Sequence, residues 1–219
     1  MDTTNSRTEM THKNIVSLCD YSSYWAWPYI QQGYNVFCVD TKKVQIFQAG
    51  KLLTEQPGLD VRSLRHSDFA PVHGVLAAPP CTMFATTGNR WRAEEKKAGT
   101  FAAKIVDALS IVDACMRFSI VSGAQWWALE NPVGTLHNYL GPPIYTFQPH
   151  EFAGGAEEER YTKRTLMWGY FNKDLEKRTA PPALGSIMKT KMGSSTEKKK
   201  GLRSRTPLGF ALSFYMANP

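Results

Sequence analysis

The segment HGVLAAPPCTMF, residues 73–84, decides the predicted fold. Its apolar residues 75–78 predict a buried strand, and the two prolines that follow end it, because proline has no backbone N–H to donate to a neighbouring strand. Cys81 comes next, among small polar and aromatic residues. A cysteine at the end of a buried strand is either a structural thiol packed in the core or a residue placed for chemistry.

Strand and helix patterns alternate on both sides of this segment. A short helix is expected over 23–33, with Pro28 either in its first turn or kinking it, and a long amphipathic helix over 93–121. Further strand-like runs are found at 14–19, 34–40, 124–132, 144–149 and 165–171. This alternation predicts an α/β fold, a mostly parallel sheet with helices on both faces.

Composition narrows the classes of protein that fit. The 219 residues, of which 42% are hydrophobic, are enough to bury one sizeable core. No apolar run is long enough to span a bilayer, and the polar N-terminus does not resemble a signal peptide, so we expect a cytoplasmic protein without membrane contact. The four cysteines lack zinc-ligand spacing, which predicts free thiols and no metal site.

The net charge of +7 suits a polyanionic partner, and it is concentrated in one segment. Residues 188–205, MKTKMGSSTEKKKGLRSR, combine many cations with Gly, Ser and Thr, which disfavour regular structure. The segment is either a solvated loop or a loop that contacts phosphates. The cations proposed for phosphate contact are Lys189, Lys191, Lys198, Lys199, Lys200 and Arg203.

Polar residues follow several of the predicted strands. In parallel sheets ligands bind beyond the carboxyl ends of the strands, where such residues meet. The residues in these positions are Cys19, Asp20, Asp40, Pro79, Cys81, Glu130 and Asn131. An acidic residue that ends the second strand, here Asp40, is suited to bind ribose hydroxyls, although Asp at a strand end is also a common turn residue.

Three motifs carry a resemblance to a known family. APPCTMF resembles the Pro-Pro-Cys motif of DNA (cytosine-C5)-methyltransferases, ALENPVG resembles their Glu-Asn motif about 50 residues later, and SLCDYSSYW occupies the place of their cofactor loop. The stretches YTKRTLMWG and RSRTPLGFALSFYMANP are similar to compact versions encoded by bacteriophages. The resemblance implies a Rossmann-like class I methyltransferase fold that binds S-adenosyl-L-methionine and acts on DNA as a monomer, in the host cytoplasm if phage-encoded.

The resemblance also implies a division of the chain and roles for its residues. The divisions are a flexible N-terminus (1–13), a catalytic domain (14–171), a small basic DNA-contacting segment (172–202) and a C-terminal motif that returns to the catalytic domain (203–219). Cys81 would add to C6 of cytosine, which activates C5, and Glu130 would donate a proton near N3. Lys163 or Arg164 would steady the base carbonyl, although YTKRT departs from the family's Gln-x-Arg-x-Arg pattern.

The cofactor loop departs most from the family. Cys19, Tyr21 and Ser23 stand where the family has Phe-x-Gly-x-Gly, and the two missing glycines imply a pocket that is reshaped or defunct. The other cofactor-contacting residues that the resemblance implies are Asp20, Trp25, Asp40, Asp60 and Pro79. Arg205, near the expected place of the transferable group, suggests carboxy-S-adenosyl-L-methionine and carboxymethyl transfer; the alternative is that Arg205 contacts a DNA phosphate.

A target cytosine must leave the duplex before its C6 can be attacked. Residues 82–91 would form the loop that closes over it, with Arg90 and Arg92 on phosphates, or they form a surface loop with chance arginines. Two other functions stay open: a degenerate methyltransferase-like protein that only binds DNA or a protein, and a transferase acting on free cytidine nucleotides. The small segment 172–202 predicts loose sequence preference.

Overall fold

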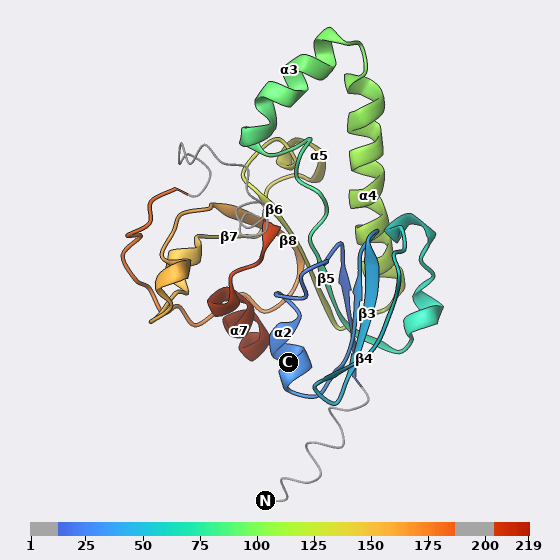
Figure 1. Cartoon of the computed structure of the whole chain (residues 1–219), viewed down its shortest axis with the longest axis vertical. Helices are drawn as coiled ribbons and strands as arrows, with labels where there is room; N and C mark the ends of the chain where they lie inside the picture. Colours follow the sequence, from blue (N-terminus) through green and yellow to red (C-terminus); the bar gives the residue numbers. More distant parts are fainter. Residues whose placement is uncertain (1–12, 187–203) are drawn as a thin grey trace, which may run out of the picture.

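The computed structural model describes residues 13–186 and 204–219 (Figure 1). Within them the chain forms one eight-stranded sheet in the order β4-β3-β2-β1-β5-β6-β8-β7. The strands are β1 (Asn14–Leu18), β2 (Asn35–Val39), β3 (Lys43–Gln48), β4 (Lys51–Pro57), β5 (Val72–Ala77), β6 (Trp126–Pro132), β7 (Tyr145–Phe147) and β8 (Thr165–Tyr170). The predicted α/β class is confirmed, and the runs at 14–19, 34–40, 73–78 and 124–132 are strands as expected.

The prediction of a mostly parallel sheet is wrong. The central strands β2, β1, β5 and β6 are parallel, but four of the seven pairings, those of β3 and β4 and those of β7 and β8, are antiparallel. Strands that follow each other without a crossover helix must run antiparallel, and β2, β3 and β4 are joined in this way. Ala49 and Gly50, at φ +49° and +79°, form the tight turn between β3 and β4.

Helices cover both faces of the sheet. The structure contains α2 (Trp27–Gln31), α3 (Asn89–Lys97), α4 (Phe101–Val121), α5 (His137–Leu140) and α7 (Leu208–Ala217), with 3₁₀ turns η1 (Val61–Ser63), η2 (His66–Phe69), η3 (Thr86–Gly88), η4 (Pro149–Glu151) and η5 (Glu157–Glu159). Because side chains alternate along a strand, Val16 and Val75 pack with α4, whereas Ile15 and Leu76 pack with α2 and α7.

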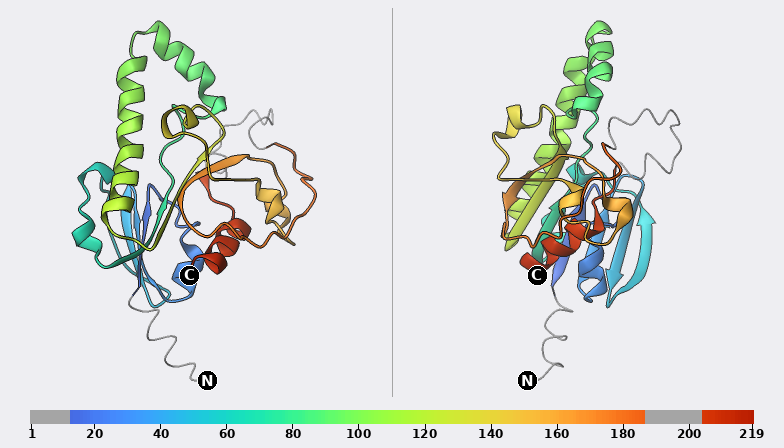
Figure 2. Two further views of the ribbon diagram at one scale, coloured as in Figure 1. Left: turned by 180° about the vertical axis from the view of Figure 1, so that it is seen from behind. Right: turned by 90° about the vertical axis from the view of Figure 1, so that its left-hand side faces the viewer.

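The helix expected over 93–121 is two helices. α3 ends at Lys97 and α4 begins at Phe101, with Gly99 between them at φ +72°, a conformation that continues neither helix. In both views of Figure 2, α3 and the first turns of α4 extend beyond the end of the sheet. None of the residues of α3 is buried, so this helix is held by polar contacts such as that of Glu95 with Lys104 rather than by core packing.

Helix α7 is anchored by a residue distant in the sequence. The carboxylate of Glu159 accepts hydrogen bonds from the backbone N–H groups of Leu208 and Gly209, which satisfies the free donors at the start of the helix. A side chain at Gly209 would collide with the carbonyl oxygen of Phe152, 2.1 Å from the position of its Cβ. This close approach places the start of α7 against the loop at Phe152, and the helix also packs against α2.

Across residues 13–186 and 204–219, no helix combines the length and the apolar character needed to cross a membrane.

Candidate active site at the carboxyl ends of the parallel strands

The loops that follow the four parallel strands meet at one end of the sheet and enclose a cavity of about 280 Å³. Predicted catalytic and cofactor residues lie together in its wall. They are Cys19, Asp20, Tyr21, Trp25, Asp40, Pro79, Cys81, Glu130 and Lys163. The sequence positions of these residues span more than half the chain, and the parallel topology brings them together.

Cys81 lies in a tight turn just after β5. Pro79 and Pro80 end the strand, and the carbonyl of Cys81 then accepts hydrogen bonds from the N–H groups of Phe84 (2.9 Å) and Ala85 (2.8 Å). The side-chain amide of Asn131 donates to the carbonyl of Pro79 at 2.9 Å. The turn is therefore fixed from within and from β6, and the thiol is held at the cavity wall.

The segments that follow Cys81 and Glu130 are joined to each other by backbone hydrogen bonds. Thr86 N–H donates to the carbonyl of Val133 at 3.1 Å, and Thr135 N–H donates to that of Phe84 at 2.8 Å. A Cβ at Gly134 would lie 2.0 Å from the Phe84 carbonyl oxygen, so this contact requires glycine. The nucleophile candidate and the acid candidate thus belong to one rigid unit.

Burial and neighbouring charges of both signs shift the pKa values of Cys81 and Glu130. Burial raises the pKa of Cys81, the negative charge of Glu130 raises it further, and the positive charge of Lys163 lowers it. Burial also raises the pKa of Glu130, while Lys163 lowers it and Asp20 raises it. Lys163 is itself only 4% exposed. A buried cation therefore favours the anionic forms of the thiol and the carboxyl, against the desolvation that favours the neutral forms.

Several buried polar atoms at the cavity have no hydrogen-bond partner among the described residues. They are Oε2 of Glu130, Oδ1 of Asn131 and Nε1 of Trp25, and all three residues line the cavity. Three other such atoms are found elsewhere in the described part of the chain. Buried polar groups are nearly always paired, so this cluster of acceptors and a donor is suited to a polar ligand.

Asp20 organises the loop that follows β1. Its carboxylate accepts hydrogen bonds from Ser17 Oγ (2.8 Å), Ser22 Oγ (3.1 Å) and the N–H of Ser23 (2.7 Å). Cys19 and Ser23 adopt φ +57° and +58°, a conformation that favours glycine, and these hydrogen bonds hold the loop in it. Ser23, at one of the two positions where glycine was expected, therefore keeps a glycine-like backbone without being glycine.

Some predicted site residues lie outside the cavity. Ser23 is buried and donates to Gln45 Oε1 at 3.1 Å, and Arg164 lines a different hollow beside Thr86. Asp60 accepts hydrogen bonds from the Arg62 guanidinium, which lower the pKa of Asp60. The Arg205 guanidinium lies over the ring of Tyr24, 4.4 Å from its centroid. The structure does not bring these four residues to the cavity wall.

The residues predicted to bind DNA differ in what they contact. Arg90 lies on α3 with a largely exposed side chain that pairs with Glu94. Arg92 instead donates to the backbone carbonyls of Met83 (3.2 Å) and Ala85 (2.8 Å), so its guanidinium holds the turn after Cys81. Residues 82–91 form a turn, η3 and the start of α3. The remaining predicted residues, Lys189, Lys191, Lys198, Lys199, Lys200 and Arg203, lie outside the described residues.

Sequence reasoning missed some residues of the cavity wall. Lys42 lines it, and its ammonium lies 4.7 Å from the centroid of the Tyr21 ring. Asn131 was recognised in the Glu-Asn motif. Its hydrogen bond to the carbonyl of Pro79 was not, because that bond depends on the pairing of β5 with β6. Ser204 and Thr206 also line the cavity; they flank Arg205, and the resemblance had placed Ser204 and Arg205 beside the cofactor.

Comparison of the sequence with models of known protein families gives no match, and comparison with curated proteins also gives none. No group of three or more potential metal ligands occurs within the described ranges.

Proposed function

We propose that the protein is a transferase that modifies C5 of cytosine in DNA, with S-adenosyl-L-methionine as the donor. The observation that carries this proposal is the convergence of Cys81, Glu130 and Lys163 on one cavity. A nucleophile, an acid and a cation at the ends of parallel strands are the groups that this chemistry requires. The parallel strands β2, β1, β5 and β6, with helices on both faces, support a class I methyltransferase fold with antiparallel additions at both edges.

Each residue has a defined task in the proposed reaction. The Cys81 thiol gives its proton to solvent water, its sulfur bonds to C6 of the base, and the electron pair of the C5–C6 double bond moves onto C5. Glu130, in which burial favours the protonated carboxyl, donates a hydrogen bond or proton at N3 as the ring gains electrons. Lys163 stabilises negative charge on the thiolate and on the base carbonyl. Once C5 carries the transferred group, solvent water takes the C5 proton, the C5–C6 double bond forms again, and Cys81 leaves C6 as a thiolate.

The cavity residues also fit a nucleoside-containing donor. Asp40 follows β2 and lines the cavity, where its carboxylate is suited to ribose hydroxyls. Tyr21 and Pro79 provide apolar surface, and the unpartnered Nε1 of Trp25 is a donor for a polar atom. When bound, S-adenosyl-L-methionine would supply the electrophilic methyl group.

The position of Arg205 favours methyl over carboxymethyl transfer. Its guanidinium Nη1 donates to the Tyr24 hydroxyl at 2.5 Å, and among residues 204–206 it is Ser204 and Thr206 that line the cavity. A carboxylate on the donor would therefore not meet Arg205 in this arrangement. Carboxy-S-adenosyl-L-methionine is the second donor to test.

Mass spectrometry of nucleosides tests the proposal. Cytosine-containing duplex DNA is incubated with the protein and either donor, then digested to nucleosides. We expect 5-methyldeoxycytidine with S-adenosyl-L-methionine and none with Cys81→Ala. Modification of free cytidine nucleotides but not of DNA would identify a nucleotide-modifying enzyme, and DNA binding without any modified nucleoside would identify a degenerate DNA-binding protein.

A further inference from the structure

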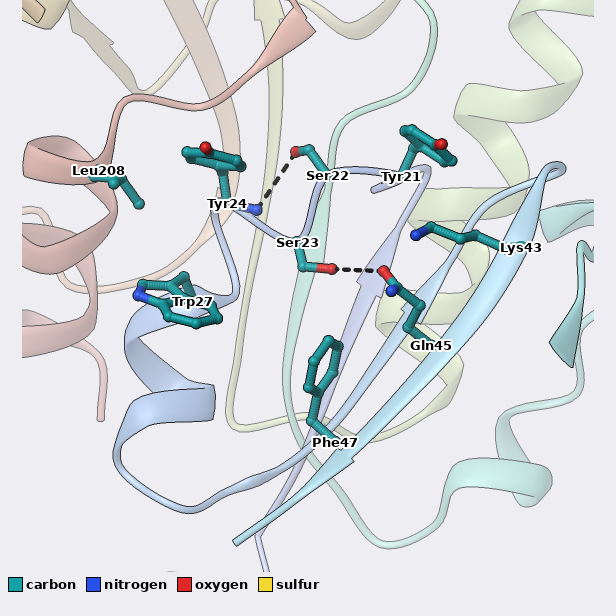
Figure 3. Close-up of a pocket in the computed structure, with 9 residues that line it drawn as sticks. All are labelled: Tyr21, Ser22, Ser23, Tyr24, Trp27, Lys43, Gln45, Phe47 and Leu208. Carbon is teal, nitrogen blue, oxygen red and sulfur yellow. Dashed lines mark hydrogen bonds between the residues drawn. The ribbon is translucent and has the colours of Figure 1, made fainter. Parts of the chain in front are cut away.

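A second pocket, of about 440 Å³, lies beside the candidate active site (Figure 3). Tyr21 and Ser22 line both cavities, so the loop after β1 is the wall between them. The rest of this second pocket is formed by Ser23, Tyr24, Trp27, Lys43, Gln45, Phe47 and Leu208. Its volume falls within the range of about 300–1,000 Å³ that is usual for small-molecule sites, and none of the proposed catalytic residues lines it.

Aromatic side chains dominate the lining of this second pocket. In Figure 3 the rings of Tyr24 and Trp27 lie on one side, and Lys43 and Gln45 project from β3 on the other. Trp27 is the first residue of α2 and is 45% exposed, so its side chain is accessible to a ligand. An exposed indole beside further rings provides a stacking surface for a planar ligand.

Polar groups are present where the edge of a planar ligand would lie. The hydroxyl of Ser23 donates to Gln45 Oε1 at 3.1 Å, and Gln45 Nε2 donates to Glu55 at 3.0 Å. The Ser23 oxygen and Gln45 Oε1 each keep capacity to accept a further hydrogen bond. The amino groups of nucleobases are donors of the matching kind.

The charges around the second pocket favour an anionic or neutral ligand. Lys43 is the charged residue of its lining, and no acidic residue is among the described residues that form it. Lys42 and Lys43 both lie within 5 Å of the Tyr21 ring centroid, at 4.7 and 4.8 Å, and Arg205 lies on the Tyr24 ring. Glu55 pairs with Lys43 at 3.2 Å, whereas Lys42 and Arg205 lie outside the lining and contact two of its rings, those of Tyr21 and Tyr24. Aromatic rings interspersed with cations are the typical composition of sites that bind unpaired nucleotides.

We infer that this second pocket is a nucleobase-binding site, in which the base stacks on Trp27. Two sources of the base share this chemistry: an unpaired nucleotide of DNA, and the adenosyl group of a cofactor that reaches past Tyr21. The choice of these sources rests on the proposed function. The binding of a base does not, because the pocket is formed without Cys81, Glu130 or Lys163.

The test uses the full chain and the fluorescence of Trp27. The probes are a five-nucleotide oligodeoxyadenylate, which contains no target cytosine and carries the amino group of adenine, and S-adenosylhomocysteine. We expect one of them to quench the fluorescence of the wild type and the effect to disappear in Trp27→Phe but persist in Trp91→Phe, another exposed indole. Quenching by the oligonucleotide identifies DNA as the source, and quenching by S-adenosylhomocysteine identifies the cofactor.

Affinity gives a second readout that does not depend on the signal of one residue. Stacking of one base contributes about 1–3 kcal/mol, so Trp27→Ala should weaken binding of the active probe by about 5- to 150-fold. Tyr170→Ala, a 74% exposed aromatic on β8 away from the pocket, is the matched control and should bind as the wild type does. If neither probe reports at Trp27, or if Trp27→Ala binds with wild-type affinity, the inference is wrong. The proposed reaction at Cys81 stands or falls separately, on nucleoside analysis.

Discussion

The side-chain amide of Asn131 donates a 2.9 Å hydrogen bond to the carbonyl oxygen of Pro79, two residues before Cys81. This bond connects the end of β6, which carries Glu130, to the turn after β5. Asn131 is fully buried, so water does not compete for the bond. The distance between the nucleophile candidate and the acid candidate is therefore set by one side chain as well as by the strand pairing.

Asn131→Ala should destabilise the fold. The substitution leaves the Pro79 carbonyl without its partner in a buried position, which typically costs about 1–3 kcal/mol in the free energy of unfolding. Urea denaturation measures this loss. Asn138→Ala, at an exposed position of α5, is the control and should change stability by no more than about 0.5 kcal/mol. Equal stability of Asn131→Ala and wild type would show that the bond does not hold the turn.

The reactivity of Cys81 should shift in opposite directions when its two charged neighbours are removed. Glu130→Gln should lower the pKa of the Cys81 thiol, because the carboxylate raises it, and Lys163→Met should raise that pKa, because the ammonium lowers it. The rate of iodoacetamide alkylation against pH reports the pKa, and peptide mass spectrometry separates Cys81 from the other three cysteines. Shifts of the same sign in both variants would contradict the described electrostatics.

Glu130→Gln should also stabilise the protein at neutral pH. Burial raises the pKa of Glu130 above its unfolded value, so its contribution to stability is fully present below the unfolded pKa of about 4.3 and is lost as pH rises through the folded pKa. Glutamine does not ionise and avoids this loss. Thermal or urea unfolding should therefore show a gain for the variant that grows from about pH 4 to about pH 8. A gain that is the same at both pH values would exclude ionisation as its cause.

Neutralising the basic segment should change how DNA binding depends on salt. Each phosphate contact contributes about 0.9 to the slope of log affinity against log salt on duplex DNA, so replacing Lys198, Lys199 and Lys200 with Ala should flatten the slope by roughly two to three. Base preference should not move, because phosphate contacts carry no base information. Lys51→Ala, at the β3–β4 turn far from the strand ends that form the cavity, is the control. An unaltered slope in the triple variant would favour a solvated loop.

Part of this structure could be predicted from local sequence. The all-buried strand β5 and the turn at Cys81 were predictable because four apolar residues run directly into two prolines. Pro28 does lie in the first turn of α2, as its fixed φ and missing N–H require. In any parallel sheet, the residues that directly follow the strands lie at the same edge. Most of the predicted cavity residues lie together for this reason.

The failures have physical causes as well. β3 and β4 were not predicted, since β4 is almost wholly exposed and its polar sequence shows no buried face, and this hairpin makes the sheet less parallel than expected. The break between α3 and α4 at Gly99 was not predicted, because the regular spacing of apolar residues through α4 indicated one continuous helix. The contacts of Arg92 with backbone carbonyls and of Arg205 with Tyr24 were not foreseen either, because one-dimensional spacing does not show contacts between distant elements.

The most direct test of the account is covalent trapping at Cys81. Duplex DNA that carries 5-fluorocytosine is incubated with the protein and S-adenosyl-L-methionine; fluorine at C5 cannot leave as a proton does, so the bond from sulfur to C6 persists. We expect a complex that survives denaturation with the wild type and with Cys115→Ala, a buried thiol on α4, and none with Cys81→Ala. Equal trapping by Cys81→Ala, or no trapping by a wild type that binds the DNA and the donor, would contradict the assignment of Cys81 as the nucleophile.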